Sequence, residues 1–377
     1  MISILVVDDT ILYRKLVSDI VAAVPGVRII GTASNGKIAL SRIAMLKPDL
    51  VTLDVEMPEL NGIEVLEAAR NAGIASAFLM VSALTTKGAD LSLRAIELGA
   101  LDAIAKPEGD AASRERFEFE LKARVEAFVR RGEIRKILGG GGRPGSARGN
   151  LTAAPESGEP TEPMPVESKV DAGAGTGSPI PRGPRGPREI VVIGISTGGP
   201  AALLELIPAL PADLPVPVLV VQHMPPLFTA SLARSLELRG KLPCKEGENG
   251  EVIKAGTVYI APGGRQMRVD LGADAMTKVL RVTDDPPENQ CRPSVDYLFR
   301  SIARQYYGRA LAIVMTGMGE DGAKAAGDIK RAGGEIIVQD EESSVVWGMP
   351  GATVAMGFAD AVLPLGSLAD AIVSRLG

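Results

Sequence analysis

The stretch EIVVIGISTGGPAALLELI, residues 189–207, predicts a buried strand, a tight glycine turn and a helix in immediate succession. The run of Ile and Val that opens it is typical of a strand buried on both faces. Pro200 suits the first turn of a helix, where a backbone N–H has no partner to lose. Gly194, Ser196 and Gly198 match the pattern G-x-S-x-G, which can present a serine hydroxyl on a sharp turn beside a helix N-terminus.

This motif alone leaves other functions open. A glycine turn before a helix can cradle a phosphate group or simply connect a strand to a helix. A dinucleotide site would need an acidic residue at the end of the second strand, but Asp213 lies before that strand and His223 stands at its end. A P-loop would need Lys followed by Ser or Thr, and this turn has neither. The nucleophile interpretation therefore depends on finding a base.

The only histidine of the sequence is His223, which follows the apolar run of residues 216–222. We expect it at the carboxyl end of the strand after the serine's strand, where chemistry gathers in open α/β sheets. A third apolar run, residues 309–315, leads into TGMGEDG and places Asp321 at the same edge. An aspartate can fix the imidazole tautomer and stabilise the imidazolium. Each residue also has a structural alternative. His223 could have no catalytic function, and Asp321 could cap the helix that starts near Ala323.

Composition bounds the class of protein. The sequence has 377 residues, 46% of them hydrophobic and 3% aromatic, with a net charge of −5, which gives no electrostatic case for nucleic-acid binding. There is no secretory signal pattern and no apolar run of about 18 residues, so we expect no membrane insertion. Cys244 and Cys291 form no metal-site spacing, and with one histidine a zinc site would be hard to assemble. We expect a cytoplasmic protein with reduced thiols.

The N-terminal part alternates strand-like and helix-like segments, five βα units in about 130 residues, which predicts a doubly wound parallel sheet. Polar residues follow the predicted strands: Asp8 and Asp9, Asp54, Ser82 and Lys106. Clustered carboxylates suit a hard cation such as Mg²⁺, and a hydroxyl and an ammonium group can contact phosphate oxygens. Asp54 would then accept a phosphoryl group. The alternative is a row of helix caps and loop charges.

The motifs VVDDT, TLDVEMPELNGIEVL, VSALT and IAKP resemble those of a two-component receiver domain, over residues 2–128. The resemblance implies that a histidine kinase phosphorylates Asp54. It implies a Mg²⁺ site made by Asp8, Asp9, Asp54 and the backbone of Glu56. It also implies that Ser82 and Lys106 sense the phosphoryl group. The sequence departs from the usual pattern at Ala103, where many receivers carry an aromatic switch residue, so an aromatic signal relay is not carried over.

Residues 139–188 differ from both flanks, since 21 of these 50 residues are Gly or Pro and none is aromatic. Such a segment buries too little apolar surface to offset the entropy of ordering, so we expect a flexible linker. The predicted organisation is a receiver domain at 1–131, a linker at 132–188 and a second α/β domain at 189–377 with its own parallel sheet.

The motifs of the second domain, GISTGGP, VQHMPPLFTASLA, YIAPGG, RPSVDYLF, VMTGMGEDGAKA and WGMPGA, resemble the catalytic domain of the chemotaxis protein-glutamate methylesterase family, CheB. The resemblance implies that Ser196 is the nucleophile, His223 the general base and then acid, and Asp321 the orienting carboxylate. The backbone N–H of Met318 is the implied oxyanion donor. Family members often carry histidine where this chain has Gln266 and Cys291. The order Ser, His, Asp differs from that of the α/β-hydrolases.

The resemblance implies a phosphorylation-activated serine hydrolase that removes methyl esters from glutamate side chains of chemoreceptors and deamidates receptor glutamines. Its partners would be the receptors and a chemotaxis histidine kinase, without nucleic acid, and the chain would be a monomer. No cofactor is expected in the esterase domain. We expect the unphosphorylated receiver to pack against the active-site mouth. The alternative is a response regulator whose second domain only binds a partner.

Overall fold

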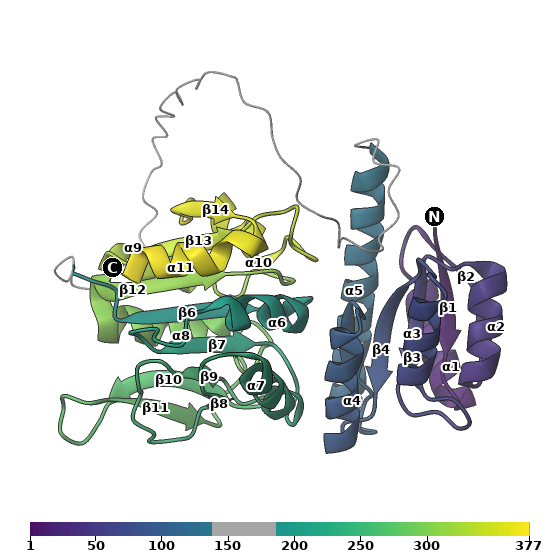
Figure 1. Ribbon diagram of the computed structural model, residues 1–377, viewed down its shortest axis with the longest axis horizontal. Coiled ribbons are helices and arrows are strands. Elements are labelled where there is room, and N and C mark those ends of the chain that lie inside the picture. Colours follow the sequence, from purple (N-terminus) through teal and green to yellow (C-terminus); the bar gives the residue numbers. More distant parts are fainter. Residues whose placement is uncertain (138–185, 377) are drawn as a thin grey trace.

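The computed structural model describes residues 1–137 and 186–376, which form two α/β domains (Figure 1). The predicted linker, residues 132–188, falls mostly on residues outside this described range. Within the described part of the chain, no helix combines the length and the apolar character needed to cross a membrane.

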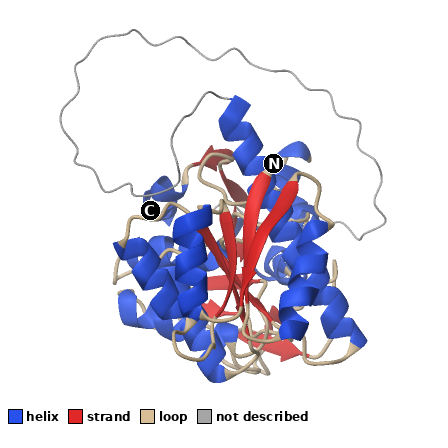
Figure 2. Cartoon of the chain, turned by 90° about the vertical axis from the view of Figure 1, so that its right-hand side faces the viewer, coloured by secondary structure: helices blue, strands red, loops and turns tan. Residues whose placement is uncertain are grey.

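The N-terminal domain is a five-stranded parallel sheet with the strand order β2-β1-β3-β4-β5. Its strands are β1 (Ile2–Val7), β2 (Val27–Ala33), β3 (Leu50–Asp54), β4 (Ala77–Ser82) and β5 (Asp102–Ala105). Its helices are α1 (Ile11–Ala22), α2 (Gly36–Leu46), α3 (Gly62–Asn71), α4 (Thr86–Glu97) and α5 (Ala111–Ile137). Figure 2 shows helices on both sides of this sheet, so the predicted doubly wound fold is confirmed.

Each face of this sheet has its own apolar core. The central strand β3 is buried along its whole length, which explains why its sequence carries no polar alternation. Phe117, Leu121 and Val125 follow one another at intervals of four residues along α5 and are buried on one face of the sheet, with relative exposures of 2%, 0% and 0%. Helix α5 therefore docks on the sheet, as its periodicity predicts.

The C-terminal domain is a seven-stranded parallel sheet with the order β14-β13-β12-β6-β7-β9-β8. Its strands are β6 (Ile190–Ile195), β7 (Val218–Gln222), β8 (Cys244–Glu246), β9 (Val258–Ile260), β12 (Ala310–Val314), β13 (Glu335–Gln339) and β14 (Ala361–Leu363). Its helices are α6 (Gly199–Ala209), α7 (Phe228–Arg239), α8 (Val295–Tyr306), α9 (Ala323–Ala332), α10 (Met349–Ala355) and α11 (Leu368–Leu376).

A second, smaller sheet lies outside this parallel sheet. The apolar run at 279–282 belongs to β11 (Lys278–Thr283), which pairs antiparallel with β10 (Gln266–Leu271) in a separate two-stranded sheet. The alternation of Met267 and Val269 with polar residues in β10 is short, and β8 has only three residues, so neither strand has a strong sequence signal. The hairpin packs on α8, and its inward side chains complete the core under that helix.

The two domains meet through helix α4, which packs against α6 and α7 (Figure 1). Leu93 and Ile96 of α4 are buried in the same apolar cluster as the inner side chains of α6 and α7. Polar contacts flank this cluster: Asp90 accepts hydrogen bonds from Ser231 and Arg234, and Glu97 accepts them from Ser235 and Arg239. The contact therefore combines an apolar centre with paired charges at its border.

Candidate active site

The strand order brings three loops to one edge of the C-terminal sheet. Strand β6 lies between β12 and β7, and all three run parallel. Ser196 follows β6 directly, His223 follows β7, and the loop after β12 carries Asp321. Backbone hydrogen bonds tie these strand ends together, from Ser196 N to Thr316 O at 2.9 Å and from His223 N to Ile195 O at 3.2 Å.

The turn that carries Ser196 is tight, and glycines occupy the positions at which a side chain would collide with a neighbouring residue. Gly198 has a φ of +77°, and a Cβ there would lie 2.5 Å from Val345. A Cβ on Gly317 would lie 2.8 Å from the Cβ of Ser196. Ser196 itself is not among the described residues with positive φ, so the strained backbone of a nucleophile elbow is not found at the serine.

His223 and Asp321 are in direct contact, with 2.8 Å between the imidazole Nε2 and Asp321 Oδ2. The Asp321 carboxylate is buried at the N-terminus of α8. Its two oxygens also accept hydrogen bonds from the Ser294 hydroxyl, the Asn289 amide and the backbone N–H groups of Val295 and Asp296. The alternative role, a cap on α9, is wrong, because Gly322 occupies that position and no side chain caps it.

These contacts set the charges of the pair. Burial raises the pKa of Asp321, but the bonds from His223, Asn289 and Val295 outweigh it and lower the pKa to about 2. Burial lowers the pKa of His223, but the sulfur of Cys291 and the Asp321 carboxylate outweigh it and raise the pKa to about 10. Asp321 is therefore ionised over the whole working range, and near neutral pH the imidazole of His223 is mostly protonated, with one proton on the ring nitrogen that faces Asp321.

The second ring nitrogen of His223, Nδ1, lies on the side of the ring next to Cys291. In the described part of the chain no hydrogen bond joins this nitrogen to the Ser196 hydroxyl, and the nearest polar atom recorded for it is Cys291 Sγ at 3.7 Å. Contacts of this kind are often long without substrate and shorten in the substrate complex. The three predicted residues therefore lie at one edge of the sheet, without a hydrogen bond between the Ser196 hydroxyl and the His223 imidazole.

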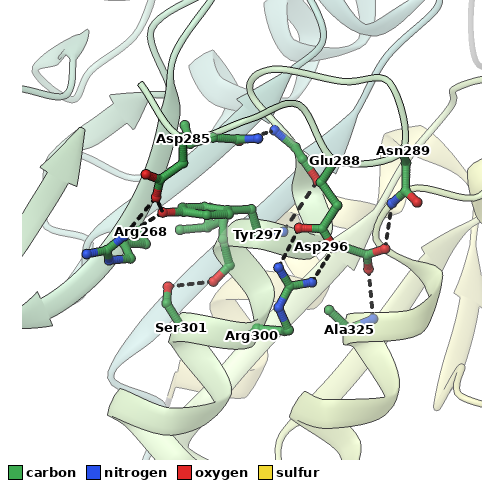
Figure 3. Close-up of polar contacts among 12 residues, drawn as sticks. Arg268, Asp285, Glu288, Asn289, Asp296, Tyr297, Arg300, Ser301 and Ala325 are labelled. Atoms are coloured by element: carbon green, nitrogen blue, oxygen red, sulfur yellow. Dashed lines mark hydrogen bonds and ion pairs between the residues drawn. The ribbon is translucent and has the colours of Figure 1, made fainter. Parts of the chain in front are cut away.

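Asn289 is a site residue that the sequence reading missed. It lies in the loop between β11 and α8, and its side-chain amide donates to both Asp321 and Asp296. Figure 3 shows the bond to Asp296. Asp296 in turn accepts a hydrogen bond from the backbone N–H of Ala325 at the start of α9 (Figure 3). The amide therefore bridges two neighbouring carboxylates and fixes the orientation of Asp321. No sequence motif predicts the contact between Asn289 and Asp321, because it depends on how the loop folds back.

Two backbone amides near the serine have free donors. Neither Met318 N–H nor Thr197 N–H donates a hydrogen bond within the described part of the chain. Met318 is the donor implied by the resemblance. Thr197 is a second candidate, because the residue after the nucleophile commonly supplies an oxyanion donor in G-x-S-x-G turns. Both amides are thus free to bind a developing negative charge.

The two positions that depart from the family pattern have distinct surroundings. Gln266 is fully buried, donates to the carbonyls of Pro286 and Cys291, and accepts from Ser294 N. It ties the loop before α8 to the hairpin. Cys291 is partly exposed and contacts the imidazole.

The polar residues of the N-terminal domain also come together. Asp8, Asp9 and Asp54 offer carboxylate oxygens within 4.8 Å of one another. Lys106 Nζ lies 2.7 Å from both Asp8 Oδ2 and Asp54 Oδ2. Burial outweighs the effect of Lys106 and raises the pKa of Asp54 to about 6. A pocket of about 350 Å³ opens beside Asp9, Asp54, Glu56 and Lys106.

This cluster fits a divalent cation. The oxygen Asp8 Oδ2 is buried and has no hydrogen-bond donor of suitable geometry, so a lone pair is available to a metal ion. The donor set consists of oxygens alone, which Mg²⁺ prefers. Ser82 is fully buried at the end of β4, and its hydroxyl donates to the carbonyl of Gly88 in the first turn of α4.

Known proteins share both domains. The family described as CheB methylesterase matches residues 191–372, and the family described as response regulator receiver domain matches residues 4–118. A protein-glutamate methylesterase/protein-glutamine glutaminase of Desulfotalea psychrophila is 46% identical over 98% of this chain and 97% of its own. One from Trichodesmium erythraeum is 38% identical over 99% of each chain.

Solved structures resemble the domains separately. The catalytic domain of the Thermotoga maritima CheB methylesterase is 41% identical, with a TM-score of 0.48, over 50% of this chain and 98% of that chain. The response regulator domain of Thermotoga maritima CheB is 35% identical, with a TM-score of 0.32, over 34% of this chain and 97% of that chain. On the full-length identities, the chain belongs to the CheB methylesterase family, and residues 4–118 form a receiver domain.

Proposed function

We propose that this protein is a receiver-controlled serine hydrolase that acts on chemoreceptors as a protein-glutamate methylesterase and protein-glutamine glutaminase. The observation that carries this proposal is the 2.8 Å contact between His223 and Asp321 beside Ser196, at adjacent strand ends. The relatives named for these two activities match along the whole chain. We assign regulation to residues 1–131 and catalysis to residues 189–377, and we expect a cytoplasmic monomer.

In this mechanism the Ser196 hydroxyl attacks the carbonyl carbon of a glutamate methyl ester, and His223 Nδ1 takes the hydroxyl proton. The oxyanion of the tetrahedral intermediate would accept hydrogen bonds from Met318 N–H and Thr197 N–H. The intermediate collapses, His223 protonates the departing methoxide, and methanol leaves. Water then attacks the acyl-enzyme with His223 as base, which releases the glutamate carboxylate. A glutamine amide follows the same route and releases ammonia.

The electrostatics bear on these roles in two ways. Asp321 is ionised and holds a proton on Nε2, so Nδ1 is the nitrogen that accepts the serine proton once the imidazole is neutral. The raised pKa of His223, about 10, keeps most of the imidazole protonated near neutral pH, so only the neutral fraction acts as the base. Two free backbone donors suit an oxyanion that forms only during the reaction, and one such donor typically lowers the barrier by about 3 kcal/mol. The Met318 loop is therefore expected to matter nearly as much as the side chains.

We further propose that the N-terminal domain is phosphorylated at Asp54 by a chemotaxis histidine kinase. Asp8, Asp9, Asp54 and the backbone of Glu56 would hold Mg²⁺, which would neutralise charge on the incoming phosphoryl oxygens. Lys106 would pair with those oxygens, as it now does with Asp54. Asp54 is a suitable acceptor because it is buried beside a cation and opens on a pocket.

The domain contact supports a gate on the esterase. Asp102, at the start of β5, accepts a hydrogen bond from Gly198 N at 3.3 Å, two residues after the proposed nucleophile. Arg124 holds the same carboxylate at 2.9 Å. The Ser82 hydroxyl bonds to α4, the helix that packs on the catalytic domain. A phosphoryl group that attracts this hydroxyl would remove its bond to Gly88 and alter the α4 face.

The function is tested by measuring methanol release from methylated receptor membranes by the full chain. We expect release, and we expect it to rise when acetyl phosphate and Mg²⁺ are added. Asp54→Asn keeps the size of the side chain but removes the acceptor, so its release should not respond to the phosphodonor. Absence of release from wild type under all conditions would favour the binding-module alternative. A response retained by Asp54→Asn would contradict Asp54 as the acceptor.

Substituting Ala103→Tyr is expected to raise methanol release without a phosphodonor. Ala103 packs against the cores of both domains, so a ring at this position cannot fit while they are in contact. Overpacking costs about 1–3 kcal/mol, equivalent to a roughly 5- to 150-fold shift toward the open form. The control is Ala72→Tyr, at an exposed position of the same domain. Unchanged basal release from a folded Ala103→Tyr protein would remove this face from the gate.

A further inference from the structure

A thiol lies beside the imidazole in a position that the esterase mechanism does not use. Cys291 Sγ is 3.7 Å from His223 Nδ1, although the two residues are 68 positions apart in the chain. His223, Cys291 and Asp321 together offer ligand atoms within 4.8 Å of one another. The sequence reading found no metal spacing at the cysteines, because this juxtaposition comes from the loop before α8 and not from a local pattern.

The separation of the two atoms suits a bridging metal ion. A tetrahedral zinc ion with bonds of about 2.3 Å to sulfur and about 2.0 Å to nitrogen holds these ligands roughly 3.5 Å apart. The 3.7 Å between Cys291 Sγ and His223 Nδ1 needs an adjustment of only a few tenths of an ångström. A soft thiolate and an imidazole nitrogen are ligands that select zinc over magnesium or calcium.

Asp321 supplies the supporting contact that zinc histidines require. A metal-bound histidine generally donates its other ring N–H to a carboxylate, which fixes the tautomer and raises the basicity of the ligating nitrogen. Here Nε2 faces Asp321 Oδ2 at 2.8 Å, so the free nitrogen is the one beside the thiol. The pair that prepares His223 to accept a proton therefore also prepares it to bind a metal.

The cysteine is held by a tightly tied loop. Residues Asp285 and Glu288 of this loop bond to Tyr297 and Arg300 on α8 (Figure 3). The carbonyl of Cys291 itself accepts a hydrogen bond from the buried amide of Gln266. Because the loop is held at two residues before the cysteine and at the cysteine's own carbonyl, the thiol and the imidazole keep their separation before any ion arrives, which favours binding.

We propose that His223 Nδ1 and Cys291 Sγ bind Zn²⁺ or a similar thiophilic cation, and that the bound ion reversibly inhibits the hydrolase. The thiol and the protonated imidazole each release one proton to solvent on binding, and the metal then occupies the Nδ1 lone pair that would accept the serine proton. Water completes the coordination. The binding rests on geometry alone, whereas the inhibition rests on the proposed function of His223.

The test uses the full-length protein with excess Mg²⁺, which saturates the oxygen-only site of the N-terminal domain. Co²⁺ is the spectroscopic probe, because a cobalt–thiolate bond gives a near-ultraviolet charge-transfer band that carboxylates do not give. We expect one equivalent of Co²⁺ to give this band in wild type. The band should disappear in Cys291→Ala and persist in Cys244→Ala, which removes the other thiol, buried in β8.

Inhibition is measured in parallel as methanol release at chelator-buffered Zn²⁺, with each variant normalised to its own rate without zinc. The half-inhibiting zinc concentration should rise at least about tenfold in Cys291→Ala and stay unchanged in Cys244→Ala, and EDTA should restore wild-type activity. A missing cobalt–thiolate band in wild type, or one that survives Cys291→Ala, would overturn the site. If a Cys291-dependent band appeared without inhibition, the metal site would stand. The proposal that the bound ion inhibits the hydrolase, and the proposed function of His223, would then be overturned.

Discussion

Replacing Ser196 with alanine is expected to lower methanol release by about 10⁶-fold in kcat, because loss of the nucleophile removes the covalent route entirely. The fold should remain, since the Ser196 side chain donates no hydrogen bond in the described part of the chain and alanine adds no volume next to Gly317. Residual hydrolysis above the water rate would come from the oxyanion donors and substrate binding alone.

The matched control is Ser374→Ala, which removes an exposed hydroxyl on α11, remote from the loops that carry the site. It should leave both stability and methanol release unchanged. Thermal unfolding of both variants separates loss of chemistry from loss of fold. If Ser196→Ala kept more than about 1% of wild-type release, a nucleophile other than Ser196 would have to be sought.

The predicted placement of the site follows from simple strand patterns. The apolar runs before Ser196, His223 and Thr316 are long, continuous and rich in Val and Ile, so they identify buried parallel strands whose carboxyl ends share an edge. The order β12-β6-β7 makes these three strands neighbours, which the sequence suggests but does not specify. A different crossover would have kept the same runs and separated the residues.

The supporting contacts were not predictable, because they depend on loops. Asn289 reaches Asp321 only because the loop between β11 and α8 turns back across the helix N-terminus, with positive φ at Asn289 and Gln290. The meaning of Ala103 also depends on tertiary contact. In the sequence, Ala103 is notable only because many receivers have an aromatic residue at this position. In the structure, its small side chain permits close packing of the two domains.

Substituting Asp321→Asn is expected to lower kcat by about 10⁴-fold, a larger effect than its loss of stability would suggest. The substitution keeps size and shape, but one carboxylate oxygen becomes an NH₂ group that donates. At the Oδ2 position this group would face two donors, His223 Nε2–H and Val295 N–H. The imidazole can relieve the conflict by moving its proton to Nδ1, which is the nitrogen that must accept the serine proton.

The opposite orientation of the amide in the Asp321→Asn variant also leaves a buried donor without an acceptor. With its nitrogen at the Oδ1 position it would face the donors of Asn289, Ser294 and Asp296, so at least one of them loses its acceptor. An unsatisfied buried donor costs about 1–3 kcal/mol, so we expect a modestly lower melting temperature in addition to the lost activity. The control is Asp370→Asn, at an exposed position in the first turn of α11, which should change neither quantity.

The pH profile distinguishes orientation from simple loss of charge. Asp321 has a pKa of about 2, so in wild type it stays ionised throughout the working range and contributes no limb to the profile. The Asp321→Asn variant removes a carboxylate that raises the pKa of His223, so its imidazole should lose its proton at a lower pH. If only the availability of neutral imidazole mattered, the variant would then be more active than wild type near neutral pH. A large loss of activity with a lowered imidazole pKa would therefore show that Asp321 acts by selecting the tautomer, whereas unchanged activity would show that it serves only to hold α8 against the loop.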